Sequence, residues 1–275
     1  MIAGSVVPVA RRTVKLDVTV EVGGIPILLR TESAIFRDLL LQRYEGFVSP
    51  GATPTYEFEI ALVEPAKALD QDAEVTRSGR QWHIDRGDFH AELDPVLRRG
   101  FVRQAANPYA IDTVLRITHS LVLAEEGGFL LHAASAIHRC SAFVFAGVSG
   151  AGKTTISRLA PQGTAVLSDE ISYVRRFHSE YRAYGTPFAG ELARVGENSF
   201  ARLKTLFLLK QGRAHRIDAV SRQEAVRALF RHILFFAKDE DAVQRVFDAA
   251  LHFVTHVPVA QLTFLPNPMV WELIQ

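Results

Sequence analysis

The first part of the chain alternates between apolar and polar residues, which is the pattern of β-strands with one buried face. Alternation runs over residues 14–22, Gly23 and Gly24 follow, and residues 25–29 are again apolar. Two strand-like segments joined by two glycines predict a β-hairpin. A helix-like segment, SAIFRDLLLQRY, begins near Thr31 or Glu32, and the prolines and glycine within 49–54 end it.

Strand-like patterns return after this helix. Residues 56–63 alternate, and residues 81–93 contain two further strand-like segments that Arg86-Gly87-Asp88 separates. We therefore predict a small N-terminal α+β domain over residues 1–105. It contains no chemical motif, and a substrate-docking role is a hypothesis that the pattern neither supports nor excludes.

The pattern changes to helical spacing at residues 108–126, and Gly127-Gly128 ends the predicted helix. Strand-like segments follow at 129–137 and 142–145, and the second of them leads into a glycine-rich loop. A helix around 156–159 and a strand at 164–167 then complete a β-α-β unit. Such a unit predicts a parallel or mixed sheet.

Residues 106–275 are predicted to form the larger, second domain. Its remaining strands are expected at 173–177, 203–209 and 257–264, and its helices at 221–237 and 240–254. The fold class that we predict is α/β, α+β overall, with a mixed sheet flanked by helices.

Composition narrows the classes of partner. The 275 residues are 48% hydrophobic, and 31 basic against 30 acidic residues leave a formal charge of +1. Without a strong net field we expect neither nucleic acid nor a membrane as partner, and no apolar run reaches the roughly 20 residues of a membrane helix. The single Cys140 cannot form an intrachain disulfide, and the first residues do not resemble a signal peptide, so we expect a cytoplasmic protein.

The glycine-rich loop has the complete pattern of a phosphate-binding loop. Its predicted ligand-binding residues are Gly147, Ser149, Gly150, Ala151, Gly152, Lys153, Thr154 and Thr155. Backbone N–H groups at such a loop and at the following helix N-terminus can bind phosphate oxygens, and Lys153 can reach the β- and γ-phosphates. The Thr154 hydroxyl is the expected ligand of Mg²⁺, so ATP and Mg²⁺ are the predicted cofactors. The competing interpretation is a glycine-rich turn with a solvated lysine.

An acidic pair follows closely. Asp169 and Glu170 end the predicted strand sixteen residues after Lys153, so helix and strand should return them to the edge of the sheet beside the loop. Carboxylates at that position can ligate Mg²⁺ or accept the proton of an attacking hydroxyl, and Asp169 is the first candidate for the base. Alternatively, the pair is a polar strand end. In a continued strand Glu170 would point away from Asp169, whereas in a turn both would converge.

A second candidate for the metal-binding acid lies further along the chain. Residues 233–239 read ILFFAKD, an apolar run that ends at Asp239, as in large ATPases. The same apolar positions also suit a buried helix.

Three linked segments resemble the HPr kinase/phosphorylase family and, more distantly, the ATP-dependent phosphoenolpyruvate carboxykinases that share its nucleotide-binding core. They are Leu131-His132-Ala133, the loop GVSGAGKTT at 147–155 and Val166-Leu-Ser-Asp169-Glu170. The resemblance covers roughly residues 130–175. It implies a kinase of Ser or Thr hydroxyls in which Asp169 and Glu170 supply acid/base and metal functions, and in which His132 also belongs to the site. His132 as an ordinary core histidine is the alternative.

The chain departs from that family in two ways. Its second acid is glutamate, and a motif like the family's later Glu-Ile-Arg-Gly is absent from the sequence. In its place stands YGTPFAGE at 184–191, followed by Arg194, which is either an ordinary turn or a loop whose arginine stabilises charge on the transferred phosphoryl group. This loop and the segment 257–264 with Trp271 resemble HPr-kinase-related proteins found with bacterial peptide-modification systems.

These observations predict a kinase that phosphorylates a Ser or Thr of a peptide or small protein. Two alternatives remain open, a kinase of a small metabolite and a non-catalytic regulator that senses nucleotide through two conformations. The family resemblance also favours a homo-oligomer.

Overall fold

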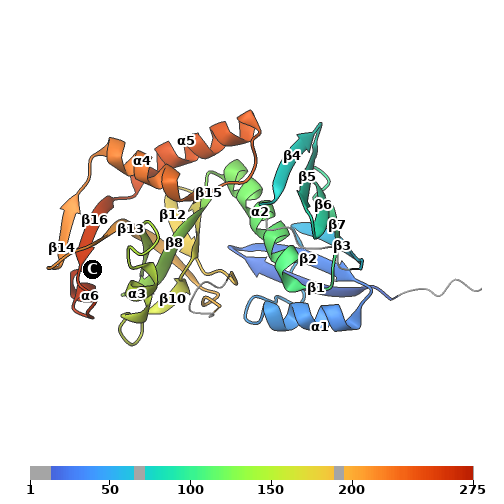
Figure 1. Ribbon diagram of the computed structural model, residues 1–275, viewed down its shortest axis with the longest axis horizontal. Coiled ribbons are helices and arrows are strands. Elements are labelled where there is room, and N and C mark those ends of the chain that lie inside the picture. Colours follow the sequence, from blue (N-terminus) through green and yellow to red (C-terminus); the bar gives the residue numbers. More distant parts are fainter. Residues whose placement is uncertain (1–13, 65–71, 189–194, 275) are drawn as a thin grey trace, which may run out of the picture.

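The computed structural model describes residues 14–64, 72–188 and 195–274, and it contains two mixed β-sheets with helix α2 (Pro108–Glu126) between them (Figure 1). The seven-stranded first sheet has the order β1-β2-β3-β7-β6-β5-β4, and the nine-stranded second sheet carries the glycine-rich loop. Both sheets combine parallel and antiparallel pairs, as β2 with β3 and β1 with β2 in the first. The predicted α+β fold with a mixed sheet is therefore confirmed.

The first sheet is built from alternating strands whose buried side chains face α1 and α2. Its elements are β1 (Leu16–Val22), β2 (Ile25–Thr31), α1 (Ala34–Arg43), β3 (Tyr56–Leu62), β4 (Glu74–Ser78), β5 (Gln81–Arg86), β6 (Phe89–Asp94) and β7 (Arg99–Gln104). The predicted hairpin is β1–β2, and α1 begins after Ser33, whose hydroxyl accepts a hydrogen bond from the Phe36 N–H at 3.2 Å. Strands β4 and β7 were missed because each buries only one or two side chains.

Helix α2 joins the two sheets. Asn107 caps its N-terminus, and Gly127, in the left-handed conformation at φ 75°, ends it as predicted. Most of its residues are buried because it contacts β6 and β7 on one side and β8, β11 and α5 on the other. One hydrophobic cluster consequently runs from the first sheet through α2 to Tyr173 of the second.

His119, in the middle of α2, is fully enclosed. Its Nδ1 lies 3.3 Å from the Tyr173 hydroxyl, and burial lowers the pKa of His119 from 6.5 to about 3. Between pH 6.5 and pH 3 the unfolded chain binds a proton at this histidine that the folded protein does not bind. The free energy of unfolding is therefore unaffected by His119 above pH 6.5 and decreases as the pH falls towards 3.

We expect His119→Gln to remove up to about 1.4 kcal/mol per pH unit from the slope of unfolding free energy against pH in this window. Urea denaturation at several pH values measures it, with the exposed His178→Asn as control; equal slopes in wild type and His119→Gln would contradict the assignment.

The second sheet is organised around one long strand, β8. Its elements are β8 (Phe129–His138), β9 (Ser141–Ala146), α3 (Lys153–Arg158), β10 (Ala165–Ser168), β11 (Ile171–Phe177), β12 (Glu180–Tyr184), β13 (Phe200–Gln211), β14 (Arg216–Ala219), α4 (Arg222–His232), β15 (Ile233–Leu234), α5 (Glu240–His256), β16 (Val259–Phe264) and α6 (Val270–Leu273). Strand β8 pairs antiparallel with β9 and β15 and also with β10 and β11.

This arrangement brings the ends of several strands to one edge. Strands β9 and β10 are both antiparallel to β8, and hence they run parallel to each other. Strand β13 lies between β9 and β16 and pairs with both of them in parallel. The carboxyl ends of parallel strands share an edge, which is where ligands bind in open α/β sheets. The predicted β-α-β unit is β9-α3-β10, with β8 between its two strands.

One expectation about the C-terminal half is wrong, and a second candidate residue has a structural role. The helix predicted over 221–237 ends at His232, because the next two residues pair with β8. Asp239, the alternative metal-binding acid, instead caps α5 by accepting a hydrogen bond from the Ala242 N–H at 3.0 Å and forms an ion pair with Arg77. Among the residues that the structure describes, no helix combines the length and apolarity needed to cross a lipid bilayer.

Candidate active site

The glycine-rich loop connects β9 directly to α3. Gly150 and Gly152 adopt φ values of 77° and 109°, which residues with a Cβ rarely adopt, and the Ala151 N–H donates to the Val148 carbonyl at 3.0 Å. The turn places the N–H groups at the start of α3 towards solvent. Lys153, the first residue of α3, folds over the loop, with its Nζ 3.0 Å from the Gly147 carbonyl.

Side chains from three later elements hold this loop in place. Gln211, at the end of β13, donates from Nε2 to the Gly150 carbonyl at 2.6 Å, and Trp271 of α6 donates from Nε1 to the Ile156 carbonyl at 3.1 Å. The ring of Phe264 lies directly against Gly152. Nothing in the sequence pattern indicated Gln211 or Phe264, since neither is near the loop along the chain.

The acidic pair lies in a turn. Strand β10 ends at Ser168, whose hydroxyl accepts hydrogen bonds from the N–H groups of Glu170 and Ile171 at 3.2 and 2.9 Å. This turn directs both carboxylates towards the loop. Asp169 is buried, with 5% of its surface exposed, and Glu170 is partly buried.

Loop, acids and histidine share one cavity of about 280 Å³. Its lining comprises His132, Ser149, Gly150, Gly152, Lys153, Thr154, Thr155, Asp169 and Glu170. Of the loop residues that the sequence proposed, Gly147 and Ala151 lie outside this lining, and the Ala151 side chain is buried in the core. The acidic pair thus lies beside the loop, where the spacing predicted it, and His132 lies in the same cavity.

The register of β8 explains why His132 belongs to this cavity. Ala133 pairs with Ala146 of β9, so His132 lies beside the point where β9 enters the loop; on its other edge His132 pairs with Ile171, next to Glu170. Burial lowers the pKa of His132, the positive charge of Lys153 lowers it further, and Glu170 opposes the shift. The imidazole is thus neutral at neutral pH.

A second histidine, His232, was not anticipated. It ends α4 and immediately precedes Ile233, which pairs with Leu131 of β8. Burial lowers the pKa of His232, and the nearby Lys153 and His132 lower it further. The pairing of Ile233 with Leu131 brings the end of α4 next to the part of β8 that carries His132. From sequence alone it is a histidine in the last turn of a helix, and only the pairing of β15 with β8 reveals its position.

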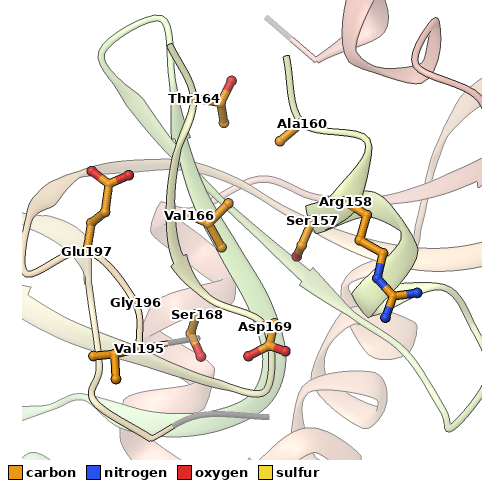
Figure 2. Close-up of a pocket in the computed structure, with 10 residues that line it drawn as sticks. All are labelled: Ser157, Arg158, Ala160, Thr164, Val166, Ser168, Asp169, Val195, Gly196 and Glu197. Atoms are coloured by element: carbon orange, nitrogen blue, oxygen red, sulfur yellow. The ribbon is translucent and has the colours of Figure 1, made fainter. Parts of the chain in front are cut away.

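A larger cavity of about 630 Å³ adjoins the first, and Asp169 lines both (Figure 2). It lies between α3 and β10 on one side and residues 195–197 on the other. Figure 2 shows Arg158 and Glu197 at opposite ends of the cavity, with Asp169 near the end of β10. The remaining lining residues are Ser157, Ala160, Thr164, Val166, Ser168, Val195 and Gly196.

The wall formed by residues 195–197 is attached to β10 by backbone hydrogen bonds. The Glu197 N–H donates to the Val166 carbonyl at 3.0 Å, and the Thr186 N–H donates to the Leu167 carbonyl at 3.1 Å. Gly196 packs so closely that a Cβ on it would lie 1.8 Å from the Leu167 carbonyl oxygen. Arg194, the predicted charge-stabilising residue, lies in 189–194, outside the described residues.

The chemistry of the donors fits a magnesium ion. The Thr154 hydroxyl and the carboxylates of Asp169 and Glu170 line the same small cavity as Lys153. Mg²⁺ prefers oxygen ligands and usually combines one or two carboxylates with phosphate oxygens and water. These three residues are therefore suitable to hold Mg²⁺ next to a bound polyphosphate.

Residues 109–275 match the family model of the SynChlorMet cassette protein ScmC. The match spans more than half of the chain and includes the loop, the acidic pair and both histidines. The chain belongs to the ScmC family. No curated protein matches it significantly.

Among solved structures, the Hpr(Ser) kinase/phosphatase from Coxiella burnetii matches with 9% sequence identity and a TM-score of 0.30. The alignment covers 53% of this chain and 85% of that one. A likeness at this level says nothing about the activity of the ScmC family member, so its function has to be argued from the site itself.

Proposed function

We propose that the protein is an ATP- and Mg²⁺-dependent kinase that transfers the γ-phosphoryl group to a Ser or Thr hydroxyl of a peptide or small protein. The observation that carries this proposal is the position of Asp169. It lines the small cavity with the phosphate loop and also the larger cavity, so it stands between a polyphosphate site and a space for a second substrate.

The residues of the small cavity have distinct roles in this proposal. The backbone N–H groups of the loop and Lys153 bind the phosphates of ATP. The pKa of His132 is lowered, which leaves Lys153 as the main positive side chain in the lining of the cavity. Thr154 and Glu170 would hold Mg²⁺, which would neutralise negative charge on the bound polyphosphate.

In the transfer step Asp169 accepts the proton of the acceptor hydroxyl. The hydroxyl oxygen forms a bond to the γ-phosphorus while the bond from that phosphorus to the bridging oxygen breaks, which yields ADP and a phosphoester. Burial of Asp169 excludes water from the proton-accepting oxygen.

A peptide acceptor is supported by the larger cavity. Its lining combines a positive end at Arg158 and a negative end at Glu197 with the small apolar side chains of Ala160 and Val166 between them. A short extended peptide offers both charged side chains and backbone groups to such a lining, whereas a small metabolite would fill only a fraction of this volume.

The test is an acceptor screen with γ-labelled ATP. Purified protein is incubated with Mg²⁺ and either a library of Ser- and Thr-containing peptides or a set of hydroxylated metabolites. We expect label on peptides, lost when the acceptor residue is replaced by alanine. Label on metabolites alone would replace the peptide by a small acceptor. Tight ATP binding without transfer to any acceptor would favour a nucleotide-sensing regulator and contradict the proposal.

A further inference from the structure

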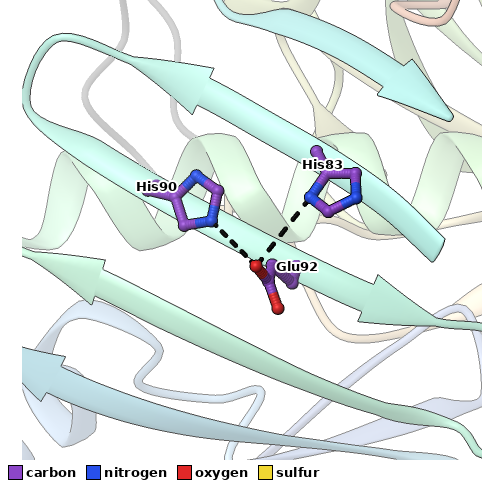
Figure 3. A group of neighbouring side chains, drawn as sticks. All are labelled: His83, His90 and Glu92. Carbon is purple, nitrogen blue, oxygen red and sulfur yellow. Dashed lines mark hydrogen bonds and ion pairs between the residues drawn. The ribbon is translucent and has the colours of Figure 1, made fainter. Parts of the chain in front are cut away.

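The outer face of the first sheet carries a second group of chemically active side chains, far from the phosphate loop and beyond α2 (Figures 1 and 3). His83 lies on β5, and His90 and Glu92 lie on β6. The two strands are antiparallel, and their register pairs His83 with Glu92 and Asp85 with His90. Because alternate residues share a face, these four side chains point away from the core that Trp82 and its neighbours form.

The distances within the group are close to those of a metal site. Glu92 Oε1 lies 3.2 Å from His90 Nε2 and 3.9 Å from His83 Nδ1, and the candidate ligand atoms of all three residues lie within 4.8 Å of one another. With metal–ligand bonds of about 2.0–2.1 Å, tetrahedral ligands lie about 3.3 Å apart. Small rotations of side chains that are 26–43% exposed would therefore complete the geometry without a change in the strands.

Asp85 supplies the supporting interaction that metal-binding histidines require. Its Oδ1 lies 2.6 Å from His90 Nδ1, an arrangement in which the Nδ1–H donates to the carboxylate. His90 Nε2 then faces Glu92 Oε1 with either a second proton or a bare lone pair. A lone pair on His90 Nε2 would repel the Glu92 carboxylate unless a cation lay between them. A carboxylate that accepts a hydrogen bond from one ring nitrogen of a histidine, as Asp85 does here, favours metal binding through the other nitrogen.

We propose that His83, His90 and Glu92 bind a divalent transition-metal ion of the zinc class, with Asp85 orienting His90. Two imidazoles and one carboxylate are the ligands that Zn²⁺ accepts readily and that Mg²⁺ does not favour. Three protein ligands leave one position for water on the solvent side.

The charges around the group favour a cation overall. Glu74 of β4 is in register with Asp85 and adds a carboxylate, whereas Arg103 of β7 is in register with His90 and adds a positive charge. Among the described residues that belong to this group or are in register with it, three are carboxylates, Glu74, Asp85 and Glu92, and one is a guanidinium, Arg103.

The experiment is a metal titration of the full-length protein after treatment with a chelator. Zn²⁺ affinity is measured by competition with a chromophoric chelator, and Co²⁺ reports ligand geometry through its visible absorption. We expect one equivalent of Co²⁺ in a tetrahedral site, roughly 100-fold or greater weakening in His83→Ala and His90→Ala, and about 10–100-fold weakening in Asp85→Asn.

The matched control is His252→Ala, because His252 and His256 stack on α5 and are another pair of neighbouring imidazoles. Lys153→Ala, at the phosphate loop, serves as a second control. Binding that survives His83→Ala and His90→Ala, or that disappears in His252→Ala, would overturn the proposal. No binding by the wild type would show that the group is an ion-pair network centred on His90. Circular dichroism verifies that each variant is folded.

Discussion

Replacing Asp169 by asparagine should reduce phosphoryl transfer by roughly 10²–10⁴-fold and leave ATP affinity within a few-fold of wild type. Asparagine keeps the size of the side chain but cannot accept the proton of the acceptor hydroxyl. Asp169 is buried where the two cavities meet. Among the described carboxylates, it alone lines both cavities, so no other carboxylate is in position to take over its role. Transfer rates with a peptide acceptor and nucleotide binding by calorimetry, measured on the same preparations, separate the two effects.

The matched control is Asp248→Asn, an exposed aspartate on α5 that accepts a hydrogen bond from Gln244. It should leave both quantities unchanged. Full transfer activity in Asp169→Asn would remove Asp169 as the base, and loss of ATP binding with a parallel loss of transfer would show that its carboxylate acts on the nucleotide or its metal.

Replacing Gly152 by alanine should weaken ATP binding by roughly 100-fold or more. The residue has a φ of 109°, and a Cβ on it would lie 2.7 Å from a ring carbon of Phe264. Because that ring is buried in the core beneath the loop, either the ring or the first turn of α3 has to shift to accommodate the methyl group. The added methyl group therefore disturbs the N–H groups that receive the phosphates.

Gly150→Ala is the control for this substitution. Gly150 also has a left-handed conformation, φ 77°, but a Cβ on it would have no atom within 4 Å. Only conformational strain of about 1–2 kcal/mol applies, which corresponds to about 5–30-fold at most. Equal losses in the two variants would show that the contact with Phe264 is irrelevant. Thermal denaturation of both proteins checks that the measured losses concern the loop.

The parts of the site that sequence could predict are those specified by local pattern. The glycines, Lys153 and Thr154 follow a strand and begin a helix, and the short helix and strand that follow determine where Asp169 returns. That Asp169 and Glu170 converge depended on a turn, and Ser168 provides it through its hydroxyl.

The parts that sequence could not predict depend on pairing between distant strands. His232 lies next to the part of β8 that carries His132 because the two residues after α4 pair with β8. Gln211 reaches the loop because β13 is parallel to β9. The apolar run that begins at Ile233 was ambiguous for the same reason, since neither periodicity nor composition shows which strand it will pair with.

The link between the first sheet and the site was also invisible in the sequence. Asp112 of α2 is buried and accepts hydrogen bonds from Arg43 and from the Tyr44 hydroxyl, the latter at 2.6 Å. Arg43 in turn donates to the Pro187 carbonyl at 3.3 Å, in the segment that leads towards the wall of the larger cavity. Motifs do not indicate such contacts, because the four partners come from distant parts of the chain and belong to no common pattern.

Strand β8 has a consequence for how the family can vary. It pairs with β9 before the loop and with β10 and β11 around the acidic turn, so the phosphate donors and the carboxylates are both positioned relative to the same few residues around His132. Insertions in the surface segments that join these strands would leave that common reference unchanged. In the proposed kinase, the geometry of transfer would therefore be set by β8 and its neighbouring strands. The side chains of Val195 and Glu197, in the opposite wall of the larger cavity, would be free to change without moving the loop or the acids.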